Sequence, residues 1–167
     1  MILKNLLPVL GFIGAALSAC ASPPASKPAA ASPSNLRAIV LRLGPGDELS
    51  QKLQELVERE QIEAGFIMTC VGSLTQAQVR FADNPSPTKL EGKFEIVSLV
   101  GTIAKSGTHL HITLADEQGR TIGGHLKPGN LVYTTAELVV GVVTDARYAR
   151  EPDPKSGYNE LVIYPKP

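Results

Sequence analysis

Hydrophobic and polar residues alternate along much of the chain after residue 35, as expected for strands that bury one face. Other stretches are continuously apolar and rich in β-branched residues, which also favours strands. Glycine, proline and polar residues separate these stretches at hairpin-like intervals. The pattern predicts seven strands, or eight if the second is broken near Gly72 and Ser73: residues 36–43, 64–82, 92–104, 108–115, 120–126, 130–146 and 158–164.

One segment, residues 47–60, has helical rather than alternating spacing. Its large apolar residues recur at intervals of four, three and one, so they share one face of an amphipathic helix that begins at or near Asp47. These residues are Leu49, Leu53, Leu56 and Val57. One main helix and about seven or eight strands, joined by mostly short connections, indicate an α+β fold with a mostly antiparallel sheet.

The N-terminus has the layout of a secretory signal, with one lysine, an apolar run and small residues before a cysteine: MILKNLLPVLGFIGAALSAC. Its ending, LSAC, resembles a bacterial lipobox, in which the signal is cleaved before the cysteine and the cysteine is lipidated. We therefore expect residues 1–19 to be a lipoprotein signal peptide and Cys20 to carry the lipid. The alternative is an ordinary cleaved signal that is followed by a cysteine.

Residues 20–35 join this signal to the predicted domain, residues 36–167. After Cys20 they are mostly proline, serine and alanine with a single charge, a composition that predicts a disordered tether. Ala21 rather than aspartate follows the cysteine, which by the sorting rule of enteric bacteria predicts an outer-membrane anchor that faces the periplasm. Cys70 has no intramolecular partner if the first cysteine is lipidated, and its apolar surroundings predict a buried, unreactive thiol.

The composition of the chain and the motifs that it lacks exclude several classes of function. The chain has 16 basic and 16 acidic residues and thus zero formal net charge. A protein that binds nucleic acid without sequence preference usually has a basic excess, so nucleic acid is not expected as a partner. The sequence also lacks the glycine-rich phosphate loops, CxxC pairs and usable Ser-His-Asp spacing of common enzyme sites.

Several segments between Leu36 and Val143 form an ordered set of motifs: GDEL, IEAGFIMTCVGSL, VRFAD, GKFEIVSLVGTI, HLHITLAD, GRTIGGHL and VYTTAELVV. In this order they resemble the plants and prokaryotes conserved domain, or PPC domain, and the C-terminal AREPDPKSGYNELVIYP is similar to the tail of bacterial members. The resemblance implies an α+β sandwich-like domain that packs as a homotrimer. In plants the domain accompanies an AT-hook, an Arg-Gly-Arg-Pro segment that enters the DNA minor groove. This sequence has no such segment, so the resemblance does not carry DNA binding over.

All three histidines of the chain lie in one predicted hairpin, residues 108–126. Alternation along its first strand places His109 and His111 on the face opposite to the buried leucines and isoleucine. A three-residue loop, formed by a type I turn and a left-handed residue, favours glycine in third place, where Gly119 lies. In this register His125 is opposite His111 and diagonal to His109, whereas a two-residue loop would place it on the other face.

Cβ atoms of opposite residues in such a hairpin are about 5 Å apart, and those of diagonal residues about 7–8 Å. Three imidazoles at these positions can converge on one ion at about 2.0–2.1 Å; Zn²⁺ suits neutral nitrogen donors best, and Ni²⁺ and Cu²⁺ are alternatives. Gly123 and Gly124 are expected to leave space beside the rings. The sequence thus predicts a metal site at His109, His111 and His125. The alternative is a polar cluster that is structural or lies at a subunit contact.

The predicted function is that of a lipid-anchored envelope protein whose domain binds a small molecule or an envelope partner at this metal site. The alternative is a metal-dependent, hydrolase-like enzyme that uses the same histidines with water at a fourth ligand position. Hydrolysis would also need a general base, for which Glu95, Glu137 and Asp116 are candidates. DNA binding, as in plant PPC proteins, ranks third because the export signal and the charge balance both oppose it.

Overall fold

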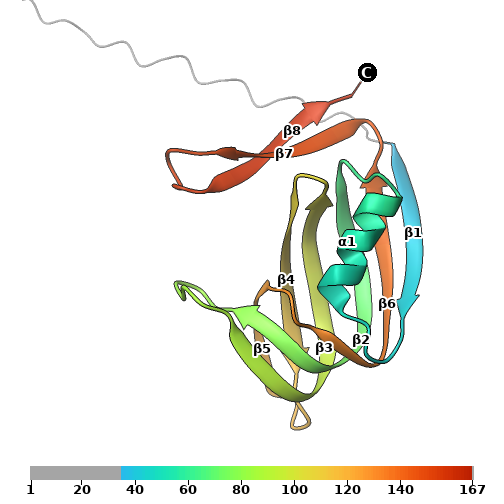
Figure 1. Ribbon diagram of the computed structural model, residues 1–167, viewed down its shortest axis with the longest axis vertical. Coiled ribbons are helices and arrows are strands. Elements are labelled where there is room, and N and C mark those ends of the chain that lie inside the picture. The colour runs from blue at the N-terminus through green and yellow to red at the C-terminus, as the bar shows by residue number, and fades with distance from the viewer. Residues whose placement is uncertain (1–34, 167) are drawn as a thin grey trace, which may run out of the picture. The chain divides into compact units, whose positions relative to one another are not determined.

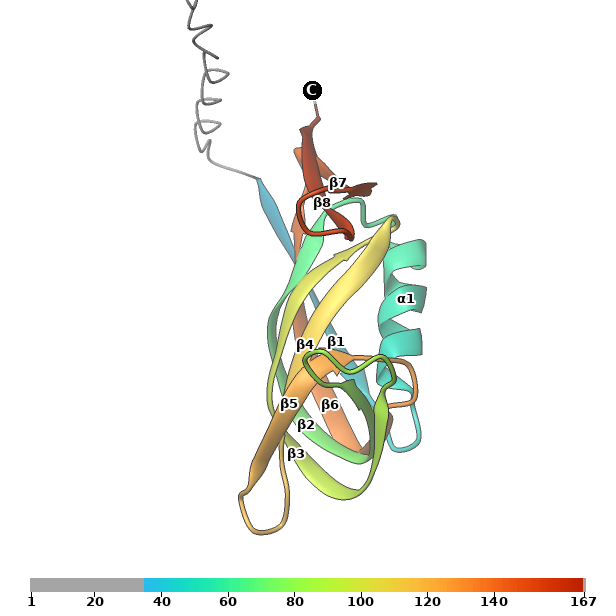
Figure 2. The same cartoon turned by 90° about the vertical axis from the view of Figure 1, so that its left-hand side faces the viewer.

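Residues 35–166 are described in this computed structural model, and β-strands dominate them (Figure 1). Six antiparallel strands form one sheet in the order β1-β6-β2-β3-β4-β5. In sheet order their bounds are β1 (Leu36–Leu43), β6 (Leu131–Val143), β2 (Gly65–Arg80), β3 (Thr88–Ala104), β4 (Gly107–Ala115) and β5 (Thr121–Leu126). The helix α1 (Leu49–Arg59) lies against one face of this sheet, and β7 (Ala146–Pro152) and β8 (Asn159–Pro165) form a separate hairpin (Figures 1 and 2).

The sheet curls back on itself, because β5 pairs with β2 as well as with β4. Two residue pairs make this closing contact, Val79 with Leu126 and Arg80 with His125. Apolar side chains on the inner side of these strands belong to one core, in which Ile112 of β4 is 1 % exposed. The closure makes neighbours of residues that are far apart in the sequence.

The predicted α+β class is wrong: the domain is mostly antiparallel β-structure with a single short helix. α1 has 11 residues, whereas β2 and β3 alone have 16 and 17. Because the sheet curls over its own core, the strands cover much of that core themselves, and one helix completes it (Figure 2). A separate helical layer, which an α+β domain would have, is therefore not needed.

Several element boundaries differ from the predicted ones; β3, for example, begins at Thr88 rather than at residue 92. β2 is continuous, so the alternative of a break near Gly72 and Ser73 is wrong, although the pairing of β2 with β6 is irregular there. A turn at Thr144 and Asp145 ends β6, and the residues after it form β7, which pairs with β8. The charged sequence of β7, ARYAREP, lacks the alternation and the β-branched residues that predict a strand. It is a strand because it pairs with β8.

The helix packs on the sheet through the four apolar residues that its sequence spacing places on one face. None of them is more than 1 % exposed: Leu49, Leu53, Leu56 and Val57. Burying each side chain of this size stabilises the fold by about 1.5–3 kcal/mol. Glu48 rather than Asp47 caps the helix, since its carboxylate accepts a hydrogen bond from the backbone N–H of Gln51. Asp47 instead accepts a hydrogen bond (2.8 Å) from the backbone N–H of Gly44 in the preceding turn.

The predicted signal peptide, the lipidated Cys20 and the tether up to residue 34 lie outside the described residues. Within residues 35–166, no helix has the length and apolar character needed to cross a membrane. Cys70 is the free cysteine of this part of the chain; it is buried, and burial raises the pKa of its thiol to about 12. A thiol that ionises so rarely is unreactive, as predicted.

Candidate metal centre

The hairpin of β4 and β5 has the predicted register. Its loop has three residues: the backbone N–H of Gly119 donates to the carbonyl of Asp116 (2.9 Å), and that of Asp116 donates to the carbonyl of Arg120 (3.0 Å). Gly119 has a φ of 75°, a conformation that glycine adopts without strain. His111 consequently pairs with His125 across the two strands.

The three histidine rings meet on the solvent-facing side of this hairpin. The Nε2 atoms of His109 and His111 are 3.2 Å apart, and the centroids of the three rings are 4.3 to 5.2 Å from one another. One nitrogen of each ring lies within 4.8 Å of the other two. Nitrogens bound to one tetrahedral ion at about 2.0–2.1 Å would be about 3.3 Å apart, so small ring rotations would bring His125 and its two neighbours into ligand geometry.

Burial lowers the pKa of His109 and of His125 below the usual histidine value, and positive charge on His111 lowers both further. Two arginines act in the same direction, Arg150 on the pKa of His109 and Arg80 on that of His125. Both rings therefore stay neutral to a lower pH than a free imidazole does. The neutral ring is the form that binds a metal ion.

Glycines around the cluster allow the backbones of neighbouring strands to approach closely. Gly123 and Gly124 were expected to leave open space beside the rings, and this expectation is wrong. A Cβ added at Gly124 would lie 2.6 Å from the carbonyl oxygen of Arg80 on β2, and one at Gly123 would also meet backbone. On β3, Gly101 has a φ of 133°, and a Cβ there would lie 2.0 Å from the carbonyl oxygen of His109. The close spacing of the strands that carry the three histidines thus depends on glycine at these positions.

A cavity of about 720 Å³ opens beside the cluster, with His109 and His125 in its wall. Its charged lining residues come from several segments: Arg80, Asp83, Lys127, Arg150 and Glu160. Sequence reasoning found none of these five. Arg80 reaches the site through the pairing of β2 with β5, and Arg150 through the position of β7, and neither arrangement has a local sequence signal.

The family of the chain follows from its sequence as a whole. Residues 30–144, more than half of the chain, match the Plants and Prokaryotes Conserved (PCC) domain, which is the family called PPC above. The chain belongs to this family. The matched residues include the hairpin with all three histidines, so the candidate metal centre is part of the PPC domain itself.

Similar domains occur in bacteria and archaea. The chain is 46 % identical over 133 residues to a protein named bifunctional protein GlmU from Synechococcus sp. (strain JA-2-3B'a(2-13)), a match that covers 80 % of this chain but 21 % of that protein. The chain thus spans about a fifth of the length of this curated relative. A solved structure of a hypothetical protein from Salmonella enterica is 40 % identical, with a TM-score of 0.80, and the match covers 81 % of this chain and 99 % of that one. A metal-containing protein from Archaeoglobus fulgidus is 25 % identical, with a TM-score of 0.66 and coverage of 78 % and 96 %.

The three carboxylates predicted as general bases are not part of the histidine cluster of this PPC domain. Glu95 lies opposite the end of β4, four residues and about 13 Å along the strand from His111. Glu137 is on β6, which β2 and β3 separate from β4. Asp116 holds the hairpin turn, where it forms an ion pair (2.8 Å) with Arg120.

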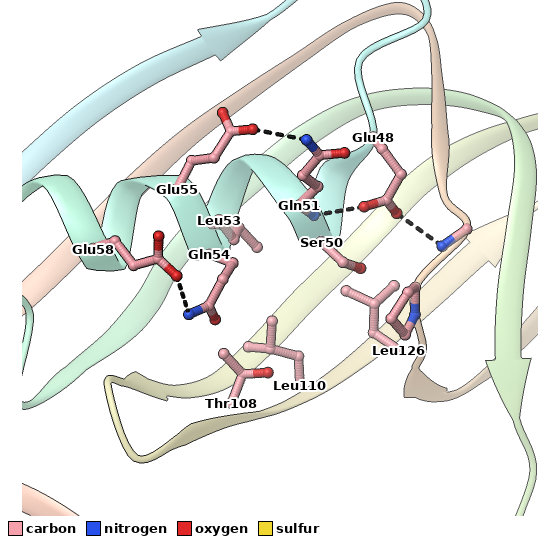
Figure 3. Close-up of a pocket in the computed structure, with 12 residues that line it drawn as sticks. Glu48, Ser50, Gln51, Leu53, Gln54, Glu55, Glu58, Thr108, Leu110 and Leu126 are labelled. Carbon is pink, nitrogen blue, oxygen red and sulfur yellow. Dashed lines mark hydrogen bonds between the residues drawn. The ribbon is translucent and has the colours of Figure 1, made fainter.

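A second cavity of the PPC domain, of about 640 Å³, lies between α1 and the strands β4 and β5 (Figure 3). Apolar side chains line its inner part: Leu53, Leu110 and Leu126. Along α1, Gln51 donates a hydrogen bond to Glu55 (2.9 Å) and Gln54 donates one to Glu58 (3.0 Å). These polar side chains are hydrogen-bonded to one another. The histidines and cations that line the first cavity make few hydrogen bonds and are free to bind a ligand. We therefore assign the candidate site to the first cavity.

Proposed function

We propose that this PPC domain is a binding module that holds a divalent transition metal ion, zinc in first place, through His109, His111 and His125. The observation that carries the proposal is that one nitrogen of each ring lies within 4.8 Å of the other two. Three imidazoles with a fourth position open to solvent suit Zn²⁺, and Ni²⁺ and Cu²⁺ accept the same donors. The similar protein from Archaeoglobus fulgidus is described as metal-containing, which supports the proposal.

The proposal is binding rather than catalysis. The predicted general bases lie elsewhere in the fold, and the two carboxylates that line the cavity, Asp83 and Glu160, are not part of the ligand cluster. A small molecule or an envelope component would take the open metal position. Nucleic acid is not part of the proposal, because a chain of zero net charge has no overall attraction for a phosphate backbone.

We also propose that the domain forms a homotrimer, as the PPC resemblance implies. Four valines on β1, β2 and β3 are more than half exposed: Val40, Val71, Val97 and Val100. Apolar side chains gathered on one sheet are typical of a surface that another subunit covers. Val100 pairs with His111 across β3 and β4, so such a contact would border the metal site.

The full-length protein, loaded with zinc and desalted, is expected to retain about one zinc ion per chain in elemental analysis without an affinity tag. Replacing all three histidines by alanine should remove the zinc, because no other cluster of this kind occurs in residues 35–166. The variant should still have the mass of a trimer in sedimentation. Thr113→Ala is the matched control, since Thr113 follows His111 on the same face of β4 and should be neutral for both measurements.

Three results would contradict these expectations. Less than about 0.2 zinc per chain in the unmutated protein would exclude the metal site. Loss of the trimer in the histidine variant, with Thr113→Ala still trimeric, would show that the histidines form a subunit contact instead. A monomeric unmutated protein would exclude the trimer.

We further propose that a lipid on Cys20 anchors the domain to the bacterial envelope, in the outer membrane and facing the periplasm. The lipobox-like ending LSAC of the predicted signal supports this. Cells that express the full-length protein are expected to incorporate labelled palmitate into it. Cys20→Ser should abolish the label and Cys70→Ser should retain it, because Cys70 is buried. Label in the Cys20→Ser variant would refute the anchor.

A further inference from the structure

Two cations flank His125 on its own face of the curled sheet. Arg80 is the residue opposite His125 in the pairing of β2 with β5, and opposite residues of an antiparallel pair direct their side chains to the same face. Lys127 follows His125 by two residues, and its backbone N–H donates to the carbonyl of Gln78 (3.0 Å), which continues the same pairing. By alternation its side chain also points to the face of His125.

A third cation reaches the other side of the cluster from β7. Nη2 of Arg150 donates a hydrogen bond to the hydroxyl oxygen of Thr102 (2.9 Å). Thr102 lies opposite His109 in the pairing of β3 with β4. Arg150 is therefore held beside the cluster by a contact that spans two separate sheets.

These three cations have no counter-charge in contact with them. None of them forms an ion pair with any of the described residues, although Asp83 and Glu160 line the same cavity. The guanidinium of Arg80 donates one long hydrogen bond (3.5 Å), to the carbonyl of Asn84. The whole chain has zero net charge, but the cavity wall has three positive and two negative side chains and thus a net charge of +1. A divalent ion bound to the histidines would add two more positive charges.

The size and chemistry of the cavity define a ligand class. Sites for small molecules are typically about 300–1,000 Å³, and this cavity is about 720 Å³. Guanidinium groups recognise carboxylates and phosphates with paired hydrogen bonds, and a metal ion with an open position binds the same oxygens. The two arginines line this cavity together with two of the three proposed metal ligands, His109 and His125.

We propose that the cavity binds a small molecule through an oxyanion, a carboxylate or a phosphate, which ligates the metal of the three-histidine site while Arg80 and Arg150 neutralise it. Lys127, which lines the same cavity, adds to the attraction. This inference rests on the proposed metal site and assigns the chemical class of what occupies its open position. Asp83 and Glu160, which line the same cavity, would select against ligands with further negative charge.

Full-length protein loaded with Co²⁺ allows the two steps to be measured separately. The visible absorption of Co²⁺ first reports whether the metal binds. Titration with inorganic phosphate, and separately with acetate, then reports whether an oxyanion enters the coordination sphere. We expect a saturable spectral change, and the probe with the lower Kd identifies which of the two oxyanions the site prefers.

Arg80→Gln and Arg150→Gln are expected to raise the Kd of the preferred probe about tenfold or more each, as for loss of a charge-assisted hydrogen bond. Neither should change Co²⁺ affinity by a comparable factor, because neither residue is a metal ligand. Arg147→Gln is the matched control: Arg147 lies on the same strand β7, where its guanidinium stacks over the ring of Tyr164, 4.5 Å from its centroid. It should leave both constants unchanged.

The possible outcomes differ in what they exclude. Absence of a Co²⁺ spectrum would exclude the metal site and, with it, this inference. A Co²⁺ spectrum that neither anion changes would exclude the oxyanion site and leave the metal site standing. Anion binding that is equally strong in Arg80→Gln, Arg150→Gln and Arg147→Gln would exclude the assigned role of the two arginines. The Co²⁺ spectrum of each variant also shows that its hairpin is folded.

Discussion

Replacing Gly101 by alanine is expected to lower the free energy of unfolding by about 2–6 kcal/mol. Gly101 has a φ of 133°, which alanine adopts only with strain. The new Cβ would lie 2.0 Å from the carbonyl oxygen of His109 and 3.0 Å from the Cα of Leu110. Since both are backbone atoms of β4, no side-chain rotation relieves the clash. The strand that holds two of the proposed metal ligands, His109 and His111, must therefore move.

Urea unfolding at one fixed protein concentration measures this effect. Gly107→Ala is the matched control, because Gly107 has a similar φ of 127° but no atom within 4 Å of the added Cβ. The free energy of unfolding of Gly107→Ala should fall only by the cost of backbone strain, about 1–3 kcal/mol. Equal losses in the two variants would show that the close approach of β3 to β4 at Gly101 is not critical. Zinc retention should fall in Gly101→Ala and be unchanged in Gly107→Ala.

The second large effect is expected for Glu48→Ala, about 2–4 kcal/mol. Oε1 of Glu48 accepts hydrogen bonds from the backbone N–H groups of Gly129 (2.9 Å) and Asn130 (2.7 Å), and Oε2 accepts one from that of Gln51. One carboxylate thus joins the first turn of α1 to the loop that follows β5. Asn130 is 0 % exposed, so alanine at position 48 would leave its N–H buried without a partner.

The contribution of Glu48 also predicts a pH dependence. Burial alone would raise the pKa of Glu48, but the hydrogen bonds from the backbone N–H groups of Asn130, Gln51 and Gly129 outweigh it and hold the pKa below its ordinary value of 4.5. A carboxyl group whose pKa is lowered by folding stabilises the protein above its unfolded pKa, and this stability is lost as the pH falls through the folded pKa. Glu48→Gln should therefore be less stable than the unmutated protein at pH 7, and the difference should shrink below about pH 4.5.

Unfolding curves at several pH values test this dependence. Glu58→Gln is the control, because Glu58 lies on the same helix but is exposed and bonds to the side chain of Gln54. It should change stability little at pH 7. A stability difference for Glu48→Gln that stays constant from pH 7 to pH 3 would contradict the assigned hydrogen-bonded carboxylate.

The hairpin with the histidines could be predicted from sequence because the information that specifies it is local. Gly119 sets the length of the loop, and alternation along β4 and β5 sets which side chains share a face. Together they place His125 opposite His111 with no reference to the rest of the chain. The four buried positions of α1 followed from the same kind of short-range periodicity.

The surroundings of the cluster could not be predicted, because they depend on contacts between distant segments. Arg80 is beside His125 only because β2 closes on β5, and Arg150 lies on a strand whose sequence has no strand pattern. The α+β class was wrong for a related reason. The number of predicted helices and strands does not show how far the sheet curls over its own core. Glu95 and Glu137 were chosen by residue type, without a pairing partner to place them, and they lie elsewhere.

The three-residue loop between β4 and β5 has a consequence for the order in which the site assembles. Bringing the imidazoles together closes only a short length of chain, which loses little chain entropy, and a hairpin forms within microseconds. We expect Arg80 and Arg150 to join them later, because their positions depend on the pairing of β2 with β5 and on the contact of β7 with Thr102. The proposed metal site would therefore form before the proposed oxyanion site is complete. A metal ion bound early at the proposed site would in turn stabilise the hairpin onto which the rest of the sheet closes.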